Sequence, residues 1–200
     1  MTTTYRQFMV AIISLCTTAM IRTTVVRPEA IPTLAPIVVT QPARVRPAVR
    51  GDVEAFMYAI GHVESGHQIG IVNQNDCIGK YQFCPSTFRF LKERQLIDTS
   101  ITREQFLADE TLQDIAMIAL MRYNYKQLRS LIRIYNGRWY NDIYVTTSGL
   151  LAAAHLVGVG GVNAYFYPDS AQYARFVIQD ANGVTAADRL KRFANYRISL

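Results

Sequence analysis

GHVESGHQIGIVNQNDCIGKYQFCPST, residues 61–87, is the stretch of this 200-residue chain from which its fold can be inferred. Apolar residues at helical spacing lead into it, so we expect a helix over residues 52–65, with Asp52 near its N-cap and Gly66 at its end. Glu64 then lies on the last turn, where the helix dipole and partial burial both disfavour an ionised carboxylate. Such a carboxyl group keeps its proton near neutral pH and can donate it to a leaving oxygen.

An aromatic segment follows the polar loop after Glu64. Tyr81 and Phe83 offer an aromatic wall, and Gln82 offers an amide that both donates and accepts hydrogen bonds. This combination suits a sugar, which has a flat apolar face and hydroxyl or amide edges. The structural alternative is a glutamate that only caps its helix or forms a salt bridge.

Glu64-Ser65 is the first of three ordered motifs. Residues 79–87, GKYQFCPST, form the second, and residues 154–162, AHLVGVGGV, form the third. Together they resemble the Glu-Ser, Gly-Leu-Met-Gln-x-x-Pro-x-Thr and Ala-Tyr-Asn-Ala-Gly-x-Gly-x-Val motifs of the soluble lytic transglycosylases, lysozyme-like enzymes that cleave peptidoglycan. The resemblance implies a mainly α, lysozyme-like domain of the transglycosylase type with little β structure.

The chain departs from this family at several positions. Asn73 stands where the family has Ser, Cys84 interrupts the second motif, and His155-Leu156 replaces Tyr-Asn in the third. Residues 148–156, SGLLAAAHL, together with residues 180–183, DANG, resemble a branch of lysozyme-like domains found in phage particles and secreted bacterial proteins.

The resemblance assigns Glu64 as the catalytic acid and base for cleavage of the MurNAc-GlcNAc β-1,4 bond. Glu64 would protonate the glycosidic oxygen, the substrate's N-acetyl group would support the cation-like centre, and Glu64 would then deprotonate the muramyl 6-hydroxyl to close a 1,6-anhydro ring. Ser65 would orient Glu64, Tyr81 would line the cleft, and Gln82 would hold a sugar amide or hydroxyl. The substrate-binding residues expected in all are Ser65, Tyr81, Gln82, Phe83, His155 and Tyr173.

Two other functions remain open at this point. Glycosidases normally pair their acid with a second carboxylate, and Asp76 is the candidate for it, so the chain could be a hydrolytic lysozyme. Asp76 could equally be an Asx residue that caps its loop. The third possibility is a structural or glycan-binding virion protein with weak activity, which His155-Leu156 would allow.

The cysteines suggest a bridge and no metal site. In an oxidising compartment a Cys77–Cys84 disulfide would staple the loop beside Glu64, unless the helix start at Pro85 holds the thiols apart. These cysteines do not combine with His62 or His67 at the spacing of a zinc motif. We expect neither a metal nor another cofactor.

The N-terminal quarter differs in composition from the rest. Residues 1–26 contain a short apolar run that predicts a signal peptide or a membrane anchor, and a buried helix in a larger assembly is a third possibility. Residues 27–50 form a Pro/Arg-rich linker. Residues 1–50 carry six Arg and one Glu, whereas residues 51–200 are nearly balanced, with 15 Lys+Arg and 14 Asp+Glu. We therefore expect no specific nucleic-acid partner.

The remaining domain, residues 51–200, is expected to be helical. Pro85-Ser86-Thr87 starts a helix to Gln95, and a capping box at Thr102 precedes a core stripe from Phe106 to Leu120 that includes Ile115. The other predicted helices cover residues 123–135, 149–157, from Asp169 or Ser170 to Ile178, and 186–196, with a short strand or extended loop over residues 138–145.

The expected partners are peptidoglycan glycan strands. Because peptidoglycan lies outside the inner membrane, the domain would be exported to the periplasm or cell envelope, or carried in a phage virion. The N-terminal segment could contact an inner or virion membrane, and other virion or secretion-system proteins are further possible partners.

Overall fold

The computed structural model describes residues 47–49 and 51–200. The predicted signal peptide or anchor, and all of the predicted linker except residues 47–49, lie outside the described residues. The helices are α1 (Val53–Ser65), α2 (Pro85–Glu93), α3 (Arg103–Ala108), α4 (Glu110–Gln127), α5 (Arg129–Tyr135), α6 (Thr147–Phe166) and α7 (Ala186–Arg192), and the strands are β1 (Arg138–Tyr140) and β2 (Ile143–Val145). The prediction of a mainly α domain with little β structure is confirmed.

Helix α1 begins and ends at the predicted residues. The Asp52 side chain accepts hydrogen bonds from the backbone N–H groups of Glu54 and Ala55, and Gly66 adopts a left-handed conformation at the C-cap. Phe56 and Ile60 are fully buried. Glu64 is therefore on the last turn of α1, as expected.

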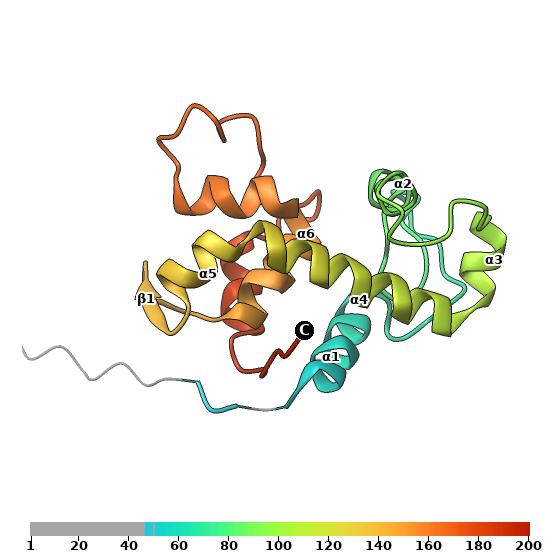
Figure 1. Ribbon diagram of the computed structural model, residues 1–200, viewed down its shortest axis with the longest axis horizontal. Helices are drawn as coiled ribbons and strands as arrows, with labels where there is room; N and C mark the ends of the chain where they lie inside the picture. The colour runs from blue at the N-terminus through green and yellow to red at the C-terminus, as the bar shows by residue number, and fades with distance from the viewer. Residues whose placement is uncertain (1–46, 50) are drawn as a thin grey trace, which may run out of the picture. The chain divides into compact units, whose positions relative to one another are not determined.

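The long helical stripe predicted after Thr102 is divided into two helices. The capping box at Thr102 is present, but Asp109 adopts an extended conformation and its side chain caps α4 by accepting from the Leu112 N–H. This break changes the helical phase, so Ile115 is 52% exposed although the continuous stripe placed it in the core. Helix α4 then crosses the middle of the domain, and α5 continues from its end (Figure 1). Helix α4 ends at Gln127 and α5 begins at Arg129, so the single helix predicted over residues 123–135 is divided between the two.

Residues 138–145 form a hairpin. β1 and β2 pair antiparallel with Trp139 opposite Tyr144, and both turn residues, Asn141 and Asp142, have positive φ. A two-residue turn with this conformation favours Asn and Asp and matches the twist of the strands.

Helix α6 is the central core helix. Thr146 caps its start, and the predicted stop after Val157 corresponds to a kink at Gly158, which has φ 71° and ψ 168°. Two hydrophobic clusters meet on its buried face, one containing Leu151 and the other Leu150. Among the described residues, α6 is long and apolar enough by length and composition to cross a membrane, but core helices share this composition and half of α6 is buried.

The predicted helix from Asp169 or Ser170 to Ile178 is wrong. Residues 167–185 form a loop of consecutive turns and bends that leads to α7. Its consecutive apolar residues Phe176, Val177 and Ile178 are partly or largely exposed, so the segment has no apolar stripe at helical spacing to bury. Thr185 then caps α7 in a capping box, and α7 begins at residue 186 as predicted but ends at Arg192, short of the expected 196.

Candidate functional site

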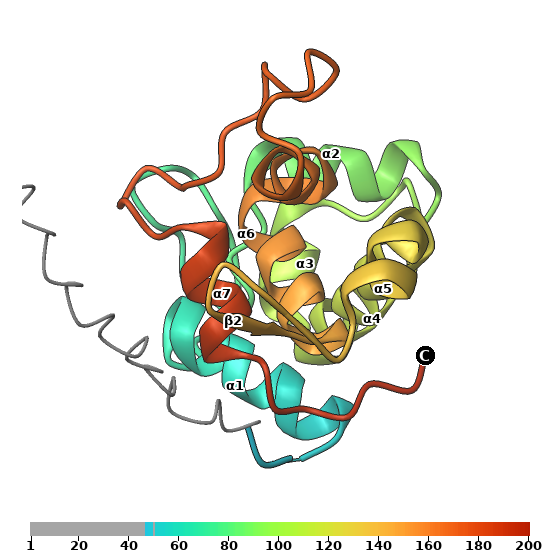
Figure 2. The same cartoon turned by 90° about the vertical axis from the view of Figure 1, so that its left-hand side faces the viewer.

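Glu64 forms an ion pair with Arg189 that the sequence did not reveal. An Nη2 atom of Arg189 lies 2.6 Å from Oε1 of Glu64, and the two side chains are only 6% and 16% exposed, respectively. Figure 2 shows α7, which carries Arg189, beside α1. We expected a protonated carboxyl group next to an apolar stripe. The structure instead gives Glu64 a buried cationic partner.

Helix packing brings Arg189 to this position. Helices α6 and α7 approach so closely at Gly149 that a Cβ there would lie 2.8 Å from the carbonyl oxygen of Leu190. The Arg189 guanidinium also lies 5.7 Å from the Phe193 ring centre. Because Glu64 and Arg189 are 125 residues apart, local periodicity carried no signal for their pairing.

Ser65 joins α1 to the second motif. Its hydroxyl donates to the Lys80 carbonyl oxygen at 2.8 Å and accepts from the Gln68 N–H at 3.1 Å. The hydroxyl therefore positions the loop of residues 79–83. We expected Ser65 to orient Glu64, whereas the structure shows the Arg189 guanidinium in contact with the Glu64 carboxylate.

Gly79 allows the second motif to approach α4. It has φ 75°, and the Gln113 side chain occupies the space where a Cβ would lie. Gln113 Oε1 accepts from the Lys80 N–H at 2.6 Å, while its Nε2 donates to the carbonyl oxygens of Ile69 and Phe106. Gln113 is fully buried, so this network fixes the path of the loop.

Tyr81 points into the core rather than into a cleft. It is 1% exposed, and its hydroxyl donates to Oδ1 of Asp114 at 2.6 Å. Burial and this carboxylate raise the pKa of Tyr81. The neighbouring Lys80 ammonium donates to Glu110 and Asp114 at 2.8 and 2.9 Å. The expectation that the Tyr81 ring lines the cleft is therefore wrong.

His155 links the third motif to the second. Its Nε2 lies 2.9 Å from the Tyr81 carbonyl oxygen, and because a carbonyl only accepts, Nε2 carries the proton. Burial lowers the pKa of His155, against the opposing effect of Glu64. The neutral ring therefore has Nδ1 as an acceptor, and this buried atom has no partner among the described residues.

A cavity of about 620 Å³ lies next to His155. Residues from α2, α4, α6 and the 167–185 loop line it, with Phe90, Tyr123, Leu156 and Val177 among its apolar members and Gln82, Asn124, His155 and Asp180 among its polar members. Of the predicted substrate-binding residues, Gln82, Phe83 and His155 line this cavity, whereas Ser65, Tyr81 and Tyr173 do not. Glu64 is not a lining residue either, but it acts electrostatically on His155.

Gln82 and Tyr173 differ in their surroundings. Gln82 has φ 49°, and its Nε2 donates to the Gly79 carbonyl oxygen at 2.9 Å. Tyr173 is in the 167–185 loop and stacks on Tyr167 with 6.1 Å between ring centres. The structure therefore brings Gln82 to the cavity and leaves Tyr173 in contact with its own loop.

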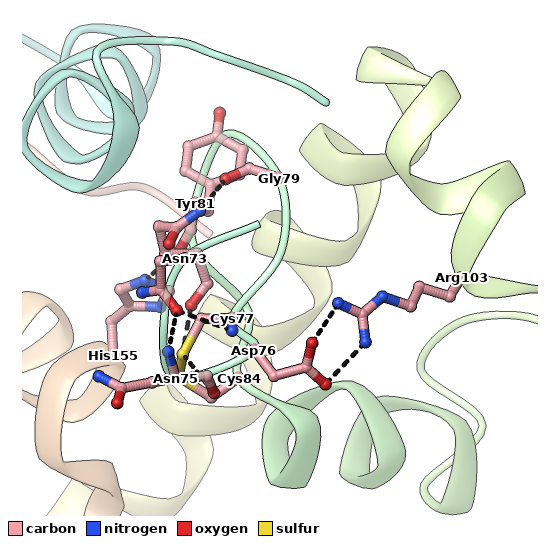
Figure 3. Close-up of a disulfide and its surroundings, with 10 residues drawn as sticks. Asn73, Asn75, Asp76, Cys77, Gly79, Tyr81, Cys84, Arg103 and His155 are labelled. Carbon is pink, nitrogen blue, oxygen red and sulfur yellow. Dashed lines mark hydrogen bonds and ion pairs between the residues drawn. A yellow bond between two sulfur atoms is a disulfide. The ribbon is translucent and has the colours of Figure 1, made fainter. Parts of the chain in front are cut away.

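Asp76 is engaged by Arg103. The two side chains form two hydrogen bonds, at 2.7 and 2.5 Å, and this contact lowers the pKa of Asp76. Figure 3 shows the Asp76 carboxylate directed toward Arg103 and away from His155. Both residues line a second cavity of about 380 Å³ that does not include His155.

Cys77 and Cys84 are joined by a disulfide (Figure 3). Asn73, which stands where the resemblance expects Ser, caps the same loop because its Oδ1 accepts from the N–H groups of Asn75 and Cys77. The helix start at Pro85 does not separate the sulfur atoms, because Cys84 is the N-cap residue of α2.

The histidines near α1 contact aromatic neighbours. His67 packs against Tyr58 with 4.1 Å between ring centres, and its ring centre lies 5.8 Å from that of His62. In the described part of the chain, no three His, Cys, Asp or Glu side chains group in a way that could hold a metal ion.

Comparisons with protein-family models, with curated proteins and with solved structures found no match to this chain.

Proposed function

We propose that this chain is a peptidoglycan lytic transglycosylase with a lysozyme-like domain, in which Glu64 is the general acid and base. The observation that carries the proposal is the meeting of three sequence motifs around one carboxylate. Ser65 of the first motif bonds to the carbonyl oxygen of Lys80, and His155 of the third motif bonds to the carbonyl oxygen of Tyr81. The first and third motifs therefore both contact the backbone of the second motif, at consecutive residues. Glu64 itself acts on His155.

In the proposed reaction, a protonated Glu64 gives its proton to the glycosidic oxygen as the bond from this oxygen to the muramyl C1 breaks. The 6-hydroxyl oxygen of the same muramyl residue then bonds to C1, and its proton returns to the Glu64 carboxylate. Glu64 ends the cycle protonated, so no water is consumed and no second protein carboxylate is needed.

The cavity beside His155 is the proposed binding region for part of the glycan, and the bond to be cleaved would lie beyond the cavity lining, next to Glu64. Its volume of about 620 Å³ is within the range typical of small-ligand sites, and its mixture of aromatic and amide groups suits sugars. Gln82 would contact a sugar hydroxyl or amide group. His155 would form part of the cavity wall, with Phe83 beside it at 5.9 Å between ring centres.

The surroundings of Asp76 favour this mechanism over a hydrolytic one. An inverting or retaining lysozyme normally uses a second carboxylate that faces the acid across the scissile bond. The Asp76 carboxylate is instead bound by Arg103 and borders the other cavity. Hydrolysis by Glu64 and Asp76 would require this contact to break.

A structural or glycan-binding role is the second candidate, and the Glu64–Arg189 pair favours it. A buried carboxylate with a guanidinium partner is also the arrangement expected of a pair that only holds α1 and α7 together. In this case the chain would keep its fold and bind glycan strands without cleaving them.

For the setting, we propose the cell envelope or a phage virion, where the domain would reach peptidoglycan and open it locally for phage entry or for a secretion apparatus. The N-terminal 26 residues would serve as a signal or a membrane anchor, and other virion or secretion-system proteins would be further partners.

Incubation of purified sacculi with the full-length chain and with Glu64→Gln tests the proposal. Soluble muropeptides with 1,6-anhydromuramic ends should appear only with the wild-type protein. Hydrated reducing ends would instead support hydrolysis. Co-sedimentation of both folded proteins with sacculi, without release of any product, would support the binding role.

A further inference from the structure

The Arg189 side chain is a buried cation directed at one carboxylate. It is 6% exposed, its Nη2 atom donates to Glu64, and its buried Nε has no partner among the described residues. Burying a guanidinium is costly unless an anion compensates it. Glu64 supplies this anion, so the buried positive charge of Arg189 is compensated at this contact.

The fold fixes Arg189 from two directions. The Thr185 and Asp188 side chains form a capping box that sets the start of α7. The close approach at Gly149 then holds α7 against α6. Arg189 therefore reaches Glu64 from a helix that is capped at its start and packed closely against α6.

The charged neighbours of Glu64 come from other elements. Arg189 on α7 and His155 on α6 both act on it. The Lys80 ammonium, in the loop next to α1, is directed at Glu110 and Asp114 on α4. Because the His155 ring is neutral and its pKa is lowered by burial, Arg189 is the cation that the Glu64 carboxylate contacts.

We infer that Arg189 is a positioning residue that orients the Glu64 carboxylate and, through its positive charge, contributes to the pH dependence of the proposed proton transfer. The inference rests on the proposed function, because it gives the proposed acid its partner. Arg189 stabilises the negative charge that develops on Glu64 as the proton moves to the glycosidic oxygen. The same contact holds the carboxylate in place while it accepts the proton of the 6-hydroxyl group.

Two substitutions separate charge from packing. Arg189→Met removes the positive charge and keeps a long side chain, while Arg189→Lys keeps the charge and loses the planar fork. Arg192→Met is the matched control, since Arg192 is on the same helix and also lies over the Phe193 ring but is exposed. All variants are made in the full-length chain.

The first readout is the pH dependence of anhydromuropeptide release. Loss of the cation favours the protonated form of Glu64, so the alkaline limb of the profile should move to higher pH by about 1 unit or more in Arg189→Met. It should stay near the wild-type position in Arg189→Lys and Arg192→Met. An unmoved limb in a folded Arg189→Met protein would overturn the inference.

The second readout does not depend on activity. In NMR titrations, the carboxyl ¹³C resonance of Glu64 should have a higher midpoint in Arg189→Met than in the wild type, and equal midpoints would overturn the inference. Should Arg189→Met fail to fold, the Arg189 side-chain N–H resonances of the wild type and Glu64→Gln are compared. Identical resonances would show that no pair exists. If the wild type releases no product, the proposed function fails, and these titrations still decide whether Arg189 controls Glu64.

Discussion

The burial of His155 makes the stability of the folded chain depend on pH. Its pKa is lowered by burial from a usual value of 6.5, so the unfolded chain takes up a proton before the folded chain does as the pH falls. The contribution of the neutral His155 ring to the free energy of unfolding is therefore complete above pH 6.5. It is lost progressively as the pH falls below 6.5, until the ring of the folded chain is also protonated.

This reasoning predicts a pH-dependent difference between the wild type and His155→Asn. Below pH 6.5, the free energy of unfolding of the wild type should fall by up to ~1.4 kcal/mol per pH unit from this group, and His155→Asn should lack that contribution. Urea denaturation at several pH values measures it. His62 and His67 are present in both proteins, so the difference between the two stability curves reports on His155. Parallel stability curves would contradict the assignment of a buried neutral ring.

A substitution at Tyr81 tests whether its side chain serves stability or activity. Tyr81→Phe removes the hydroxyl bond to Asp114 and should lower the free energy of unfolding by about 1–3 kcal/mol. It should leave activity nearly intact, because His155 binds the backbone carbonyl of residue 81. Tyr58→Phe is the control, since Tyr58 is 65% exposed. A selective loss of activity with unchanged stability would show instead that the hydroxyl acts on the substrate.

At the scale of elements, the disulfide joins the loop of the second motif to the start of α2. It closes a short loop, with a sequence separation of 7, so the serine variant of both cysteines should lose about 2–3 kcal/mol of stability. Thermal unfolding with and without reductant measures this loss. Reductant should lower the melting temperature of the wild type and of Cys16→Ser, but not of the Cys77→Ser/Cys84→Ser protein. No effect of reductant on the wild type would contradict the bridge.

The contact between α6 and α7 depends on the absence of a side chain at residue 149. In Gly149→Ala, the new Cβ would lie 2.8 Å from the Leu190 carbonyl oxygen and 3.2 Å from its Cα, both of them backbone atoms. The helices must separate, which should cost about 1–3 kcal/mol of stability and displace Arg189 from Glu64. Gly70→Ala is the matched control, since nothing lies within 4 Å of its added Cβ. Chemical denaturation of both variants should show a loss only for Gly149→Ala, and equal stabilities would contradict the tight contact.

The elements with local signals could be predicted from the sequence. Asp52, Thr102 and Thr185 each cap a helix through a bond made within three residues, so their roles are visible in short stretches. The 169–178 helix was predicted from a capping residue alone, without an apolar stripe. The break at Asp109 was missed because its side chain competes locally with a helix that the stripe otherwise favoured.

At the scale of the whole molecule, the candidate site depends on contacts between distant residues. Glu64, Gln82 and His155 could be selected from their motifs, but whether a side chain faces a cavity or the core could not. Tyr81 turned inward because Asp114 on α4 accepts its hydroxyl, and Arg189 reached Glu64 through helix packing. Both partners come from segments without a recognisable motif.

The central claim is that Glu64 cleaves the glycan by intramolecular ring closure, and cleavage in water enriched in heavy oxygen tests it most directly. Sacculi are digested by the full-length wild type and by Glu64→Gln, and the new muramyl ends are analysed by mass spectrometry. We predict 1,6-anhydro ends without heavy oxygen for the wild type and no new ends for Glu64→Gln. Heavy oxygen in the new muramyl ends, or equal cleavage by both proteins, would contradict the account.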